Sequence, residues 1–177
     1  MKLENNRIRL RAPEPEDLEL LYHWENDTGM WVVSETLEPF SRFQLKEYIS
    51  QCNRDIYTAK EQRLMIETIE SPHCVGIIDM FQLDPFHRKA ALGILIGNEY
   101  RKQHYASDAL EIYCGYAFGY LQLHQLYCEI IASNTVSIQL FEKSGFRCVA
   151  RLKDWRRIGS DYTDVFLYQR LQPDNNR

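Results

Sequence analysis

Residues 94–110 have the composition and spacing of a phosphate-binding segment. A nearly apolar strand is expected to end before a short polar loop, and a long helix is expected to begin near Tyr105. Such a junction directs free backbone N–H groups and the positive end of the helix dipole at one point. Arg101, Lys102 and His104 add cationic groups there. The pattern favours phosphate binding, and a plain strand-to-helix connection is the alternative.

Carboxylates form a second group that could do chemistry. Residues 12–41 contain eight acidic side chains and no Lys or Arg, whereas residues 141–177 contain eight basic side chains against five acidic ones. The first segment is suited to attract a cation and the second tolerates an anion, although a solvated helix face would also explain the acidic segment. The formal net charge of -4 argues against general nucleic-acid binding.

The length of 177 residues fits one domain, which we expect to cover residues 1–171 and to be followed by a polar tail at 172–177. No apolar stretch is long enough for a membrane span, and the charged N-terminus does not resemble a secretory signal. Five cysteines without a C-x-x-C pair suggest reduced thiols in a cytoplasm, with no disulfide framework. The histidines show no metal-ligand spacing, so we expect no metal.

The elements that must position these residues follow from hydrophobic periodicity. Ser41 and Asn134 are suited to begin helices, Gly145 to end one, and Gly159-Ser160 to turn between two strands. The order predicts an α/β layer with a mixed sheet, and its most apolar strand, 90–96, should lie in the middle. Strands are expected at 7–11, 63–69, 74–83, 90–96, 126–132, 147–153 and 161–171, and helices at 14–25, 41–53, 105–121 and 134–144.

Four blocks of the chain resemble one enzyme family. Residues 100–110 are similar to an Arg/Gln-x-x-Gly-x-Gly/Ala pyrophosphate loop, with Arg101 and Ala106 in register. Residues 134–146 are similar to an Asn…Tyr-x-Lys-x-Gly-Phe segment, residues 123–127 to a strand entry, and residues 159–165 to a closing hairpin. The family is the GNAT acetyltransferases, and the resemblance is nearest to the branch of spermidine N-acetyltransferases and ribosomal-protein N-terminal acetyltransferases.

The resemblance implies a GNAT fold, with a mixed and splayed central sheet of about six to seven strands flanked by about four helices. It also implies acetyl-CoA as the acetyl donor and direct attack by a primary amine in a ternary complex. Backbone groups at the end of the strand 90–96 would pair with the pantetheine arm. The cofactor-binding residues that it implies are Ile94, Leu95, Ile96, Arg101, Lys102, Gln103, His104, Tyr105, Ala106, Ser107, Asn134, Phe141 and Lys143.

The chain departs from the family pattern at two of these positions. His104 stands where the family usually has Gly, which adopts a positive φ more easily. Phe141 stands where the family commonly has a Tyr that returns a proton to the leaving thiolate, and Phe has no proton to donate. Ser137, Tyr105 and Tyr100 are weak candidates for that role, so the catalytic residue stays unassigned; protonation by water is the alternative.

The resemblance to the spermidine branch favours a polyamine as the acceptor. A polycationic amine requires carboxylates around its pocket, although each candidate could also be a helix cap, a loop acid or an exposed strand end. The expected partners are a small-molecule amine and further copies of this chain, in the cytoplasm. N-terminal acetylation of a protein and non-catalytic sensing of an acyl-CoA are the alternatives. The candidate substrate-binding residues are Asn26, Glu35, Glu38, Asp79 and Asp84.

Overall fold

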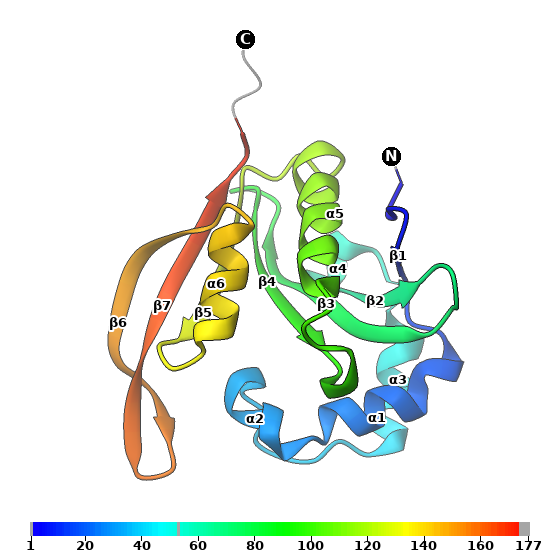
Figure 1. Ribbon diagram of the computed structural model, residues 1–177, viewed down its shortest axis with the longest axis horizontal. Helices are drawn as coiled ribbons and strands as arrows, with labels where there is room; N and C mark the ends of the chain where they lie inside the picture. Colours follow the sequence, from blue (N-terminus) through cyan, green and yellow to red (C-terminus); the bar gives the residue numbers. More distant parts are fainter. Residues whose placement is uncertain (1, 53, 174–177) are drawn as a thin grey trace.

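The computed structural model describes residues 2–52 and 54–173, and its centre is a seven-stranded sheet (Figure 1). The strand order is β1-β2-β3-β4-β5-β7-β6. Neighbouring strands are antiparallel except for β4 and β5, which are parallel, so the sheet is mixed as expected. The strands are β1 Ile8–Arg11, β2 Gln62–Thr68, β3 Cys74–Asp84, β4 Lys89–Ile96, β5 Gln125–Ile131, β6 Arg147–Ile158 and β7 Asp161–Leu171.

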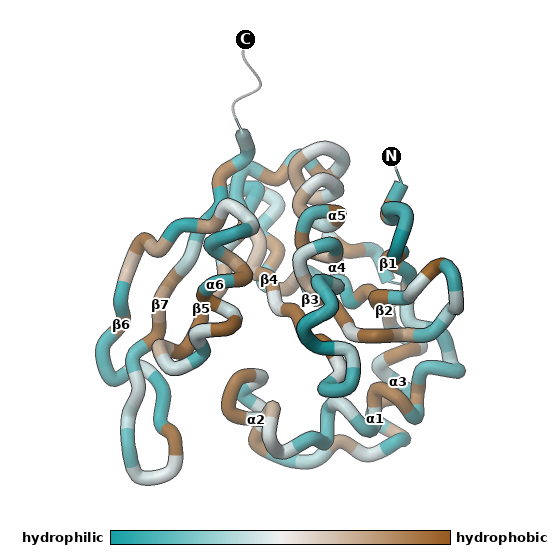
Figure 2. Tube along the Cα trace, viewed as in Figure 1, coloured by the Kyte–Doolittle hydropathy of each residue, from teal (hydrophilic) through white to brown (hydrophobic). Residues whose placement is uncertain are grey.

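Each strand lies close to the range expected from sequence, and β4, expected in the middle because it is nearly continuously apolar, is the central strand. Brown, hydrophobic stretches run through β2, β3 and β5, whereas the loop that enters α5 is teal (Figure 2). Strand β6 is longer than the expected 147–153, because its pairing with β7 resumes after an irregularity between Leu152 and Arg156. The two strands then continue to the turn at Gly159 and Ser160.

Helices cover both faces of the sheet. One core, between the sheet and α5 and α6, contains Leu110, Leu126 and Phe141, and a smaller core on the other face contains Leu21 and Ile49 of α1 and α3. The helices are α1 Leu18–Glu25, α2 Thr28–Ser34, α3 Arg42–Gln51, α4 Ile56–Ala59, α5 Tyr105–Gly119 and α6 Thr135–Lys143, with 3-10 turns η1 Pro15–Asp17 and η2 Asn98–Tyr100.

Four of these helices were expected, with differences at their ends. The expected helix 14–25 begins as the 3-10 turn η1, which has Pro15 at its first position, and becomes α-helical at Leu18. Ser41 and Asn134 cap α3 and α6 as predicted, and Gly145 adopts φ 82 after α6. The expected end of the second helix at residue 53, and residues 174–177 of the expected tail, lie outside the described residues.

Helices α2 and α4 were not predicted. Helix α2 contains Gly29, Val32 and Val33, which have low helix propensity, and it begins because Asp27 accepts a hydrogen bond from the Gly29 N–H. Helix α4 has four residues, too few for a periodic pattern. In the part of the chain that the structure describes, no helix has the length and apolar character to cross a membrane.

The parallel strands β4 and β5 pair over a short length and then separate. Their register covers Lys89↔Gln125, Ala90↔Leu126 and Ala91↔Tyr127. Beyond this point β4 continues to Ile96 and β5 to Ile131, so each strand has an edge that the other does not cover. Residues 90–92 are buried and residues 93–96 are half-buried. The sheet therefore opens toward the carboxyl ends of both strands, as the expected splay requires.

Gly76 keeps the open end of β4 close to β3. A Cβ at position 76 would lie 2.2 Å from the Leu95 carbonyl oxygen and 2.8 Å from Cδ1 of Ile96. Both contacts are shorter than van der Waals distance, and the first is with backbone that cannot rotate away. Any side chain at position 76 would therefore displace the edge of β4 that faces the opening.

We expect Gly76→Ala to lower the free energy of unfolding by about 1–3 kcal/mol, the usual cost of overpacking. Gly93→Ala is the matched control, because a Cβ there meets Phe81 at an ordinary 3.5 Å. Urea unfolding of the two variants tests this. Equal stability of both variants would show that β3 and β4 have room to separate.

Candidate functional site

At the N-terminus of α5, the first backbone N–H groups have no hydrogen-bond acceptor among the described residues. The first hydrogen bond of the helix runs from the Asp108 N–H to the His104 carbonyl at 3.1 Å, and His104 makes no side-chain cap. The N–H groups of Tyr105, Ala106 and Ser107 thus precede the helical ladder. Among the described helices that begin from a loop, the other four are capped by a side chain: Asp27 for α2, Ser41 for α3, Asp55 for α4 and Asn134 for α6.

Arg7, which directly precedes β1, fixes this helix start. Its Nη1 donates to Oδ2 of Asp108 at 2.6 Å, and its Nη2 donates to the Gln103 carbonyl at 2.8 Å. Its guanidinium carbon also lies 5.2 Å from the centre of the Tyr105 ring. Sequence reasoning did not select Arg7, because 101 positions separate it from Asp108. One cation therefore holds both the loop and the first turn of α5.

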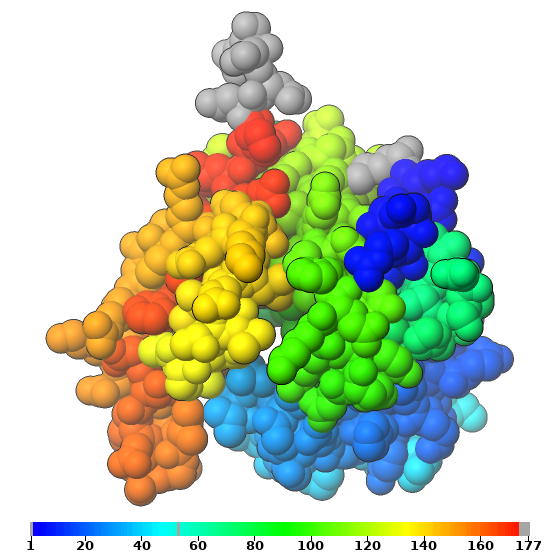
Figure 3. Space-filling model, in the orientation of Figure 1, coloured from blue at the N-terminus to red at the C-terminus, as the bar shows by residue number. Residues whose placement is uncertain are grey.

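The loop before α5 brings its cationic residues to the surface. Arg101, Lys102 and His104 are exposed, and Nε of Arg101 donates to the Ile96 carbonyl at 3.3 Å. Nη2 of Arg101 lies 3.1 Å from Sδ of Met30 in α2. The Arg101 guanidinium therefore lies between the end of β4 and the helix α2. Figure 3 shows the surface hollowed between the yellow α6 and the green segment that leads into α5.

Left-handed backbone conformations shape the same loop. His104 adopts φ 67 and ψ 5, the conformation expected for the position where Gly is usual, and Lys102 adopts φ 63. For an L-residue other than Gly this region costs about 1–2 kcal/mol. These two left-handed residues turn the loop sharply into α5, so that the helix start faces the end of β4.

The residues of α6 have mainly structural contacts. Oδ1 of Asn134 accepts from the Ser137 N–H at 3.1 Å, so the Asn134 side chain caps the helix. Phe141 is 3% exposed, and its ring packs edge-on against Phe146 at 5.0 Å. Lys143 is exposed in the last turn. Phe141 is therefore a core residue, and its side chain has no proton to donate.

The three weak candidates for proton transfer are dispersed. Ser137 and Tyr105 are half-buried at the starts of α6 and α5. Tyr100 follows β4, and its ring lies 5.3 Å from the ring of His73. The structure thus gives none of them a distinctive arrangement for acid chemistry.

The candidate substrate residues do not form one cluster. The amide of Asn26 bonds the backbone of Tyr22 and Phe40, which holds the loop after α2. The backbone N–H of His87 lowers the pKa of the Asp84 carboxyl at the end of β3. Glu38 is exposed in a loop.

Glu35 and Asp79 each share an arginine with a second carboxylate. Arg63 bonds Asp79 at 2.7 and 2.8 Å and also bonds Glu25. Arg156 bonds Glu35 and lies 3.3 Å from Oε2 of Glu129. Sequence reasoning missed Glu25, Glu129 and both arginines, since no local pattern joins residues so far apart. The binding roles assigned from sequence to Ile94, Leu95, Ile96 and the other candidates stay predictions.

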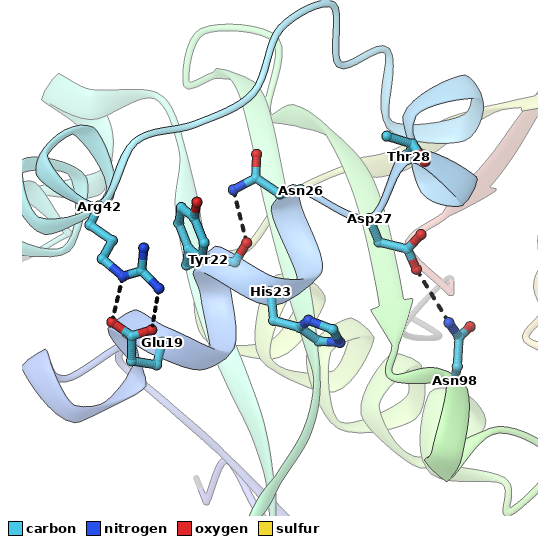
Figure 4. A pocket seen from close by; sticks show the side chains of 8 residues that line it. All are labelled: Glu19, Tyr22, His23, Asn26, Asp27, Thr28, Arg42 and Asn98. Atoms are coloured by element: carbon cyan, nitrogen blue, oxygen red, sulfur yellow. Dashed lines mark hydrogen bonds and ion pairs between the residues drawn. The ribbon is translucent and has the colours of Figure 1, made fainter.

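A separate hollow of about 600 Å³ lies beside α1 (Figure 4). The polar side chains in it are bonded largely to one another: Arg42 to Glu19 at 2.8 and 2.9 Å, and Asn98 to Asp27 at 3.2 Å. Of the candidate residues, Asn26 alone lines it. Its lining is Glu19, Tyr22, His23, Asn26, Asp27, Thr28, Arg42 and Asn98.

Comparisons with known proteins match most of the chain. The Acetyltransferase (GNAT) domain matches residues 7–147. Spermidine N(1)-acetyltransferase of Vibrio cholerae is 26% identical over 164 residues, which are 91% of this chain and 91% of the relative. The Vibrio cholerae spermidine N-acetyltransferase solved with CoA and spermine has a TM-score of 0.86 at 24% identity, and covers 95% of this chain and 97% of its own. A dodecameric structure of a Vibrio cholerae spermidine N-acetyltransferase has a TM-score of 0.76 at 24% identity, and covers 95% of each chain.

Substitutions at His104 test the strained helix start. We expect His104→Gly to change the free energy of unfolding by less than about 1 kcal/mol, because relief of strain offsets the greater freedom of Gly in the unfolded chain. His104→Val should lower it by about 1–2 kcal/mol, since a β-branched residue tolerates positive φ poorly. Thermal unfolding of both variants measures this. Equal stability of the Val variant and the parent would contradict the left-handed assignment.

Proposed function

This chain belongs to the acetyltransferase (GNAT) family, as its four motif blocks predict, and we propose that it transfers an acetyl group from acetyl-CoA to a polyamine such as spermidine. The family makes it an acetyl-CoA-dependent N-acetyltransferase. The observation that carries the acceptor is the match, over nine tenths of both chains, to a relative named spermidine N(1)-acetyltransferase.

The helix start of α5 is suited to hold the pyrophosphate of coenzyme A. It offers the three N–H groups of residues 105–107, the positive end of the dipole of a 15-residue helix and the exposed cations of the loop. A site for an anion needs donors without protein partners, and the lack of a side-chain cap at His104 supplies them. We therefore assign the pyrophosphate to the loop from Arg101 to Ser107.

The uncovered edge of β4 is suited to hold the pantetheine arm. An extended strand edge presents alternating N–H and C=O groups, and the two amides of pantetheine have the complementary groups. The edge beyond Ala91 leads from the α5 loop to the point where β4 and β5 join. Acetyl-CoA, when bound there, supplies an activated acyl group between the two strands. On one face of the sheet, α5 and α6 cover this region and exclude water from it.

Negative charge on the face of the sheet opposite α5 and α6 favours a cationic acceptor. The carboxylates of Glu25 and Asp79 share Arg63, and those of Glu35 and Glu129 share Arg156. Each group of three charges has a net charge of minus one. A polyamine with separated ammonium groups matches separated sites of negative charge better than a monoamine does.

Phe141 requires that the acetyl transfer proceed without a tyrosine donor at this position. The low basicity of a thiolate allows it to leave unaided and take a proton from water. The chain then contributes by holding the amine and the thioester together and by letting the ammonium lose its proton. The roles of Ser137 and Tyr105 as donors are not required by this proposal.

The wider organisation follows from the same relatives. We propose that residues 1–171 form one catalytic domain that acts in the cytoplasm as a homo-oligomer. A dodecameric spermidine N-acetyltransferase supports self-association.

The acceptor is tested by release of free thiol from acetyl-CoA with spermidine, spermine, short diamines, amino acids and peptides that begin with Ala or Ser. We expect turnover with the polyamines. Turnover with the peptides alone would indicate protein N-terminal acetylation. Tight CoA binding without turnover of any amine would indicate a non-catalytic acyl-CoA sensor.

The pyrophosphate assignment is tested by Arg7→Leu, which frees the loop and the first turn of α5. We expect the KM for acetyl-CoA to rise about tenfold, because donors that are no longer prearranged bind an anion less well, with little change in kcat. Arg151→Leu is the matched control, since it removes an exposed arginine paired with Asp164 on the distant hairpin. An unchanged KM for acetyl-CoA in the Arg7 variant would exclude this role for Arg7.

A further inference from the structure

Arg156 of β6 joins two carboxylates that come from different parts of the chain. Glu35 is the C-cap of α2, and Glu129 lies in β5. The Arg156 side chain is 15% exposed, whereas Glu129 is 37% and Glu35 is 63% exposed. The guanidinium is therefore the inner member, and both carboxylates remain accessible to solvent.

Glu129 lies directly beyond the point where β4 and β5 separate. The last paired residue of β5 is Tyr127, and Glu129 is two positions further along the strand. Residues two apart on a strand share a face. Leu126, Cys128 and Ile130 point into the core under α5 and α6, so Tyr127 and Glu129 point to the opposite face. Glu129 thus lies beside the opening between β4 and β5, on the face of the sheet that α5 and α6 do not cover.

The surroundings of Glu129 support this placement. Burial, and then the negative charges of Glu129 and Asp84, raise the pKa of the Tyr127 phenol. The Tyr127 hydroxyl donates to Oε1 of Gln82 at 2.6 Å, so its proton is already used in a hydrogen bond within the chain. Among the described residues, Arg156 is the cation paired with Glu129.

We propose that Glu129 binds an ammonium group of the acceptor, in the position that the Arg156 guanidinium takes in this structure. The inference rests on the proposed function, and it identifies a substrate-binding residue for that reaction. Arg156 then competes with the acceptor for the carboxylate of Glu129. A cation that enters the opening exchanges with Arg156, which keeps its bond to Glu35.

This exchange favours polycations over other amines. A neutral or singly charged acceptor has little to offset the lost attraction between Arg156 and Glu129. An acceptor with several ammonium groups replaces that attraction and adds contacts with the remaining negative charge. The same pair of residues therefore binds the acceptor and selects for its charge.

Two variants give opposite results if the proposal holds. Glu129→Gln removes the negative charge, and we expect spermidine to bind about tenfold more weakly, as for loss of a hydrogen bond to a charged group. Arg156→Gln removes the competitor, and spermidine should bind more tightly, by about threefold or more. Isothermal titration of spermidine into the CoA-saturated protein measures both, and the KM for spermidine should follow the same order.

A purely structural ion pair gives a different pattern. Both variants would then weaken spermidine binding together, and a lower melting temperature would accompany the loss. Glu47→Gln, which changes an exposed carboxylate of α3, is the matched control and should bind like the parent. Binding by Glu129→Gln that is within twofold of the parent overturns the proposal, whatever Arg156→Gln does.

The experiment separates this inference from the proposed function. If the parent acetylates spermidine and Glu129→Gln does so with an unchanged KM, the inference fails and the function stands. If the parent acetylates peptides instead, the polyamine proposal fails, and an unchanged peptide KM in Glu129→Gln overturns the inference as well. If no amine is bound or acetylated, both fail.

Discussion

The structure depends on the short parallel pairing of β4 and β5. Three residue pairs join the strands at one end, and in the described part of the chain no pairing joins them at the other. At the opening, backbone groups that a continuous sheet would pair stay uncovered by the neighbouring strand, as the proposed pantetheine site requires. It also places α5 and its free N–H groups beside that surface. Gly76 maintains the opening from the other side, because it lets β3 hold the edge of β4 in place.

Arginines organise the charge around this opening. Arg7 connects the first strand to the loop and first turn of α5, and so sets the direction in which the free N–H groups point. Arg63 and Arg156 each hold two carboxylates on the opposite face. One side of the opening is therefore suited to an anion and the other to a cation. This separation matches a reaction between a phosphorylated donor and a cationic amine.

The strands and the loop that leads into α5 could be predicted from sequence because each is a local pattern, whereas phosphate binding by that loop stays a prediction. The loop and helix start of residues 101–107 are contiguous, so their types and spacing were visible. Helix α2 was missed because its cap and its contacts, and not its propensities, stabilise it. Arg7 and Arg156 were missed because their partners are brought close only by the folded sheet. Asn26 was predicted to bind substrate, but its amide is hydrogen-bonded to the backbone of Tyr22 and Phe40, contacts that the sequence does not reveal.

A crystal structure of the protein with CoA would locate the cofactor relative to α5 and β4. We expect phosphate oxygens within hydrogen-bond distance of the N–H groups of Tyr105, Ala106 and Ser107, and a pantetheine arm along the edge of β4 that ends beside Tyr127. A CoA molecule bound in the hollow beside α1, with β4 and β5 still uncovered, would contradict this expectation.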